Sequence, residues 1–91
     1  MSESIDEKLA RYRRLTKSAL EKVMVVKGSE GQAEKLLVMA RSYYSDAKFF
    51  EERGEKLTAL AAYSYAHAWI DAGVKLGVLD GQGDDRLFTL P

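Results

Sequence analysis

Apolar side chains recur at intervals of three and four residues along most of the chain, which is the spacing of an amphipathic helix. The first such stripe consists of Ile5, Leu9, Tyr12, Thr16, Ala19, Val23 and Val26. Ser4 and Glu7 have the spacing of a capping box, in which each side chain accepts a hydrogen bond from the other residue's backbone amide. The pattern predicts a first helix over about residues 5–26, which ends before Gly28.

Two further periodic segments predict helices over about residues 31–53 and 56–77, with Gly54 in the short turn between them. Ser29 and Gln32 have the spacing of a second capping box at the start of the earlier helix. The later helix is apolar nearly all round and carries a single polar line. Because the turn is short, the two helices are expected to pack as an antiparallel hairpin.

The chain after Asp80 is a turn rich in glycine and aspartate, followed by Leu87, Phe88, Thr89 and Leu90. We expect this tail, residues 80–91, to fold back onto the helices. The turn lacks the pattern of a calcium loop, because Asp85 stands at the position that needs glycine and Pro91 stands at the position of the closing glutamate. The sequence therefore predicts one all-α domain over residues 1–91, a three-helix up-down-up antiparallel bundle with a short C-terminal tail.

Composition narrows the classes of function. The 14 basic and 14 acidic residues cancel, which argues against nucleic acid as a partner, because nucleic-acid binders usually carry a basic excess. The chain has no cysteine, so it has no disulfide and no thiolate metal site. We also expect it to bind no metal and no cofactor. Apolar runs are too short for a membrane span and the first residues are acidic, so we expect a cytoplasmic protein without membrane contact.

Asparagine is absent, and glutamine occurs only at Gln32 and Gln82, whereas lysine and glutamate are plentiful. Depletion of thermolabile residues together with many residues able to form ion pairs is typical of proteins from thermophiles. The composition therefore predicts a thermophilic source.

The predicted hairpin resembles a tetratricopeptide-type unit. The aromatic and small positions of that pattern are occupied by Tyr43, Ala47, Phe50, Ala59, Tyr63 and Ala66. The chain departs from the pattern at Asp46, where an apolar residue is usual, and at Asp71, where proline is common. A single unit cannot form the stacked groove with which such arrays bind peptides, so this resemblance concerns hairpin packing alone.

A resemblance over more of the chain is carried by the segments ARSYYSDA at residues 40–47 and YAHAWIDAG at residues 65–73, with Phe50 and Gly54 between them. These segments resemble the archaeal family named domain of unknown function 357. The resemblance implies a compact helical bundle of about this length and an archaeal source. It implies no catalytic or binding residues, since that family has no established activity.

The polar line of the third predicted helix contains Ser64, His67, Asp71 and Lys75. His67 and Asp71 are four residues apart, so Asp71 has the spacing to orient His67 as a base, or both to ligate a metal. Neither site is complete, because no other histidine or cysteine exists and Ser64 lacks the context of a nucleophile. The interpretation we favour is a solvent-facing polar stripe, with Asp71 paired to Lys75.

The densest basic cluster, a candidate contact for anions, consists of Arg11, Arg13, Arg14 and Lys17. These residues have the charge to bind phosphates, but Glu7 and Glu21 share their face and no aromatic side chain is interleaved to stack a base. A solvated face opposite the apolar stripe is the interpretation we favour.

Two apolar residues of the second predicted helix, Val38 and Phe49, project away from its core stripe, with Ser42 and Ser45 between them. This strip has the character of a surface for a partner helix or a second copy. The apolar tail is an alternative cover, in which case the strip belongs to the core.

The sequence supports three hypotheses for function. The first is a non-catalytic module for protein–protein interaction or self-association through the strip. The second is a nucleic-acid-binding accessory protein that uses the basic face of residues 11–17. The third, which we favour least, is an enzyme built on His67 and Asp71.

Overall fold

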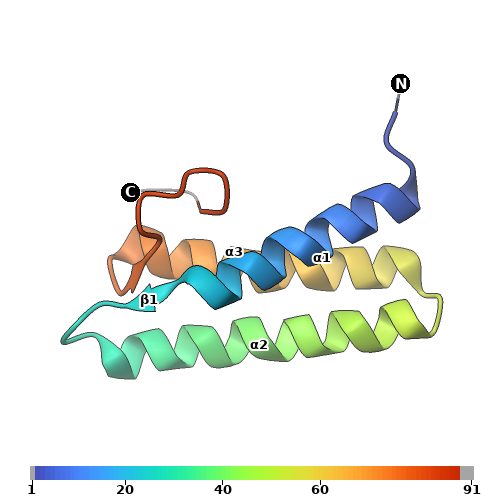
Figure 1. Ribbon diagram of the computed structural model, residues 1–91. Helices are drawn as coiled ribbons and strands as arrows, with labels where there is room; N and C mark the ends of the chain where they lie inside the picture. Colours follow the sequence, from blue (N-terminus) through green and yellow to red (C-terminus); the bar gives the residue numbers. More distant parts are fainter. Residues whose placement is uncertain (1, 89–91) are drawn as a thin grey trace.

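The computed structural model describes residues 2–88, which form three helices and one pair of very short strands (Figure 1). Helix α1 spans Ile5–Lys22, α2 spans Glu30–Glu52 and α3 spans Lys56–Leu76. Strand β1 is Met24–Val25 and β2 is Leu79–Asp80. The three helices run up, down and up, which confirms the predicted all-α three-helix bundle.

The start of α1 follows its sequence signal. The Glu7 amide donates to the Ser4 hydroxyl at 3.1 Å, and the Ser4 amide donates to the Glu7 carboxylate at 3.3 Å, so the capping box forms. The predicted end of the helix at Val26 is wrong, because α1 ends at Lys22 and Val23 is already extended.

An antiparallel strand pair replaces the last predicted turn of that helix. Met24 pairs with Asp80, and Val25 pairs with Leu79. The Val26 amide extends the pairing by donating to the Val78 carbonyl at 3.0 Å. Valine favours extended backbone because its branched Cβ restricts side-chain rotamers in a helix, and the end of the chain supplies a strand partner for this segment. The result is a clasp, β1 with β2, that joins the ends of α1 and α3.

The second predicted capping box is also wrong. Ser29 makes no side-chain hydrogen bond at the start of α2. The Glu30 carboxylate instead accepts hydrogen bonds from the backbone amides of Glu30 and Gly28, which lower the pKa of Glu30. At the other end, Gly54 has a φ of 78°, a left-handed conformation that turns the chain directly into α3.

Helix α3 is the central element, because it packs against α2, α1 and β2. Alanines form much of its contact with α2 and allow the two helices to approach closely: Ala33, Ala40, Ala47, Ala59, Ala62 and Ala66. Gly73 lies under β2 so tightly that an added Cβ would overlap the Leu79 side chain. The clasp is therefore packed directly onto the end of α3.

The molecule has two layers. Its Cα atoms extend 41 × 27 × 16 Å, and the smallest dimension fits two helix layers, since packed helix axes lie about 8–10 Å apart. One layer is the α2–α3 hairpin, and α1 crosses it on one side (Figure 1). The tail lies beside α1, where Leu87 and Phe88 pack against the core as the sequence predicts, whereas Thr89 and Leu90 lie outside the described residues. None of the helices within residues 2–88 combines the length and the hydropathy that a membrane span requires.

Candidate functional site

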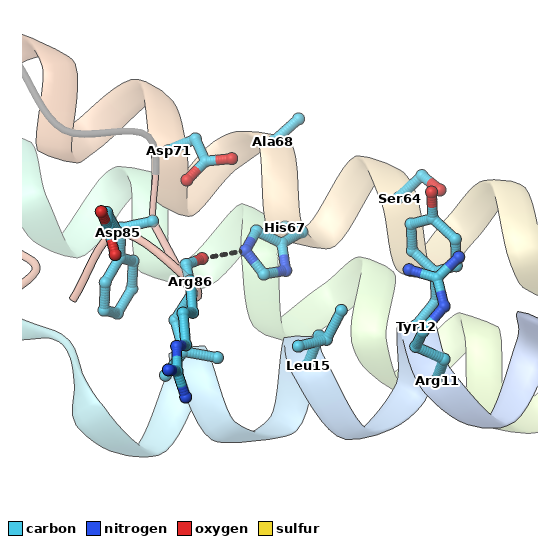
Figure 2. A pocket seen from close by; sticks show the side chains of 11 residues that line it. Arg11, Tyr12, Leu15, Ser64, His67, Ala68, Asp71, Asp85 and Arg86 are labelled. Carbon is cyan, nitrogen blue, oxygen red and sulfur yellow. Dashed lines mark hydrogen bonds between the residues drawn. The ribbon is translucent and has the colours of Figure 1, made fainter.

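An open cleft of about 420 Å³ lies between α1, α3 and the tail (Figure 2). It brings together one member of the basic cluster and three members of the polar line, whereas Lys75 does not line it. Its charged and polar side chains include Arg11, Ser64, His67, Asp71, Asp85 and Arg86. The sequence alone does not place Asp85 and Arg86 here, because they reach the cleft only when the tail folds back.

His67 points from α3 toward the tail (Figure 2). Its Nε2 donates a hydrogen bond to the Leu87 carbonyl, which can only accept, so Nε2 carries a proton. Its Nδ1 lies 3.4 Å from the hydroxyl of Thr16, a buried residue of α1. Both ring nitrogens therefore contact the protein, and His67 joins α1, α3 and the tail. The expectation that His67 faces solvent is wrong, since the ring is half-buried among these partners.

The cleft holds further polar groups besides His67, among them Ser64 and Asp71 of α3. The Ser64 hydroxyl donates to the Leu60 carbonyl of its own helix at 3.0 Å. Among residues 2–88, no group of three or more histidine, cysteine or acidic side chains has the arrangement to hold a metal ion. The hydrogen bond from His67 to the Leu87 carbonyl connects α3 to the tail at this cleft.

The four residues of the basic cluster have separate environments. Arg11 makes two hydrogen bonds of 2.9 Å to Glu3, and this hydrogen-bonded guanidinium lowers the pKa of the Glu3 carboxyl. Arg13 pairs with Glu51 of α2. Arg14 and Lys17 are exposed on α1. Two of the four cations are thus held in ion pairs, one near the start of α1 and one between α1 and α2.

Glu51 also accepts a hydrogen bond of 2.7 Å from the hydroxyl of Tyr63, whose residue is fully buried. Burial raises the pKa of the Tyr63 phenol, and the hydrogen bond to Glu51 adds to the effect. Arg13, Glu51 and Tyr63 thus connect all three helices. The arrangement gives Arg13 a structural role that its place in a basic cluster does not reveal.

The predicted strip on α2 is exposed along its length. Val38 is 48% exposed and Phe49 is 54% exposed, with Ser42 and Ser45 also exposed between them. The Phe49 ring contacts the Phe50 ring at 5.6 Å between centroids. Leu87 and Phe88 line the cleft with α1 and so lie away from the strip. Leu90, the third apolar residue of the predicted cover, lies outside the described residues.

A second apolar surface, which the sequence does not reveal, lies on the side of the α2–α3 hairpin away from α1. We define this open face by the apolar residues Leu36, Met39, Tyr43, Phe50, Tyr65 and Leu76. Two shallow hollows mark its ends, one of about 350 Å³ that contains Leu36 and Leu76, and one of about 190 Å³ that contains Tyr43, Phe50 and Tyr65. No residue of α1 lines either hollow.

The middle of the open face is continuous between the two hollows. The Tyr43 and Tyr65 rings connect α2 and α3, with centroids 5.4 Å apart. Met39 and Trp69 lie four residues from these tyrosines, hence on the same sides of their helices. Tyr65 and Leu76 are 60% and 71% exposed. The signal for this face was the nearly uniform apolarity of the third predicted helix, which is typical of a helix covered on all sides.

The comparisons with known proteins give one match. The model of a family described as "Protein of unknown function (DUF357)" matches residues 11–79. Among curated proteins and among solved structures, nothing matches this chain. The matched residues include most of α1, all of α2 and α3, and the first residue of β2. The family model thus covers well over half of the chain, and the protein belongs to the DUF357 family.

Proposed function

We propose that this protein is a non-catalytic module for protein–protein interaction, which binds its partner through the open face of the α2–α3 hairpin. The observation that carries the proposal is that α3 is apolar on the side away from α1, where the described chain supplies no cover. Contiguous exposed apolar surface on a small protein marks a site of interaction.

The composition of the open face supports a protein as the partner. Its aromatic and methionine side chains are the types enriched at the centre of protein interfaces. Lys35 and Asp46, one in each hollow, supply opposite charges, which suits neither an anionic lipid surface nor nucleic acid. In the cleft, the Nε2 of His67 is hydrogen-bonded to the Leu87 carbonyl of the tail, which supports a structural role for this residue over catalysis.

Affinity capture from the native source tests the proposal with two matched double variants. Met39→Glu with Leu76→Glu places charge on the open face, and Val38→Glu with Phe49→Glu places the same charge on the strip. We expect the open-face variant to lose a partner that the parent captures in stoichiometric amount and that the strip variant retains. An untagged copy of this chain counts as such a partner. Both substituted pairs are exposed, so helix content measured by circular dichroism stays unchanged. Equal capture of every partner by the parent protein and by both variants would refute the proposal.

We also propose that the protein works in the cytoplasm of a thermophilic archaeon. The absence of asparagine and cysteine and the high content of lysine and glutamate support this setting. The midpoint of thermal unfolding is then expected above the range of about 45–65 °C that is usual for mesophilic domains. A midpoint within that range, measured by circular dichroism, would contradict the thermophilic source.

A further inference from the structure

We propose that the open face binds a second copy of this chain, with α2 packed antiparallel on α2 and α3 antiparallel on α3 around a two-fold axis. The inference rests on the proposed function and names its partner. Two hairpins that pack in this way form a four-helix arrangement, in which the apolar side of each α3 is covered.

The pattern of charge on the face carries the inference. Lys35 is the charged residue that lines the hollow beside Leu76, and Asp46 is the charged residue that lines the hollow beside Phe50. Both residues are exposed, and within the part of the chain that the structure describes neither forms an ion pair. The two hollows therefore differ in the sign of their charge.

Helix geometry makes this pattern self-complementary. Lys35 and Asp46 are eleven residues apart on α2, so they are separated by about 16 Å along the helix axis. A two-fold axis midway between them, close to Met39, places Lys35 of one copy opposite Asp46 of the second copy, and the reverse pair forms by symmetry. Each hollow then faces the hollow of opposite charge, whereas a parallel arrangement would oppose like charges.

The area of the face is sufficient for a specific but weak dimer. The face extends from Gln32 to Phe50 along α2, about 27 Å, and is two helices wide, about 20 Å, which gives roughly 540 Å² of projected area per copy. Two copies together bury about 1,100 Å² by this measure, which lies just above the threshold of about 1,000 Å² for specific interfaces. We therefore expect association with a dissociation constant in the micromolar range.

Charge reversal tests the arrangement directly. Lys35→Asp alone or Asp46→Lys alone opposes like charges at both symmetric contacts, and each is expected to weaken association at least about tenfold. The double variant Lys35→Asp, Asp46→Lys restores opposite charges and is expected to return the dissociation constant to within about threefold of the parent. Lys17→Glu, a charge reversal on the exposed surface of α1, is the matched control and is expected to leave association unchanged.

Sedimentation over a range from about 1 µM to about 1 mM measures the association. Trp69 is the only tryptophan and lies one turn from Tyr65, so its emission should shift to shorter wavelength as the face becomes covered. A chain that remains monomeric throughout this range, or a double reversal that associates no better than the single variants, would overturn the inference. If the chain is monomeric but the Met39→Glu, Leu76→Glu variant loses a captured protein other than this chain, the inferred dimer is refuted and the proposed function stands.

Discussion

Replacing Tyr63 with phenylalanine isolates the contact that connects the three helices. The substitution keeps the buried ring and removes the hydroxyl that donates to Glu51. A hydrogen bond to a charged group contributes about 1.5–3 kcal/mol to stability. The Glu51 side chain is 26% exposed, so water can replace the lost donor, and we expect a loss near the lower value. For a domain of this size, about 1.5 kcal/mol lowers the unfolding midpoint by roughly 6–12 °C.

Urea unfolding followed by circular dichroism measures this loss. Tyr65→Phe is the matched control, because its hydroxyl is on an exposed residue and its removal should change the free energy of unfolding by less than about 0.5 kcal/mol. A double-mutant cycle with Glu51→Ala should return a coupling energy of about 1 kcal/mol. If Tyr63→Phe is as stable as the parent, or if the two substitutions are additive, the proposed connection does not stabilise the fold.

Three further perturbations test the clasp and the tail. Gly73→Ala places a methyl group against buried Leu79, and the overpacking cost of about 1–3 kcal/mol should exceed the gain in helix propensity of about 1 kcal/mol; unchanged urea stability would contradict the tight packing. His67→Ala removes the donor to the tail, so amide exchange at residue 88 should accelerate; equal protection would argue against the tether. The hydrogen bond from the Lys22 ammonium lowers the pKa of Asp84 below its ordinary 3.8. The stability that this contact contributes is therefore fully present above pH 3.8 and is lost as the pH falls through the lowered pKa of Asp84. In acid titrations of stability, Asp84→Asn should abolish this pH dependence.

Local signals in the sequence were sufficient for the three helices, for the start of α1 and for the turn between α2 and α3. The capping box at Ser4 involves residues three apart, and the turn at Gly54 depends on one residue's φ, so both can be recognised from the chain itself. The end of α1 cannot be recognised in this way, because the apolar spacing continues through Val26 whether this segment is helical or extended. Its extended state depends on Leu79, more than fifty residues away, and helical periodicity contains no information about that partner.

The candidate sites show the same division. Helical spacing indicates that His67 and Asp71 share one face of α3, whereas the cleft on that face and the contacts of His67 depend on α1 and the tail. The apolar sides of α3 were visible in the sequence, whereas the choice of which side α1 covers is a property of tertiary packing. The exposed strip on α2 can therefore be recognised from the sequence, whereas the open face cannot, because that face exists only once both helices of the hairpin are in place.

The clasp also determines the order in which the chain can complete its fold during synthesis. Helix α1 is made before the other helices, yet β1 must wait for β2, in which Asp80, the partner of Met24, follows it by 56 residues. At about 5–20 residues per second, the ribosome needs roughly 3–11 seconds to add that length. The α2–α3 hairpin, whose contacts are local, can assemble in this interval, and closing the long loop around it is a late event. The apolar stripe of α1 is thus exposed to chaperones and to other nascent chains for seconds in each round of translation.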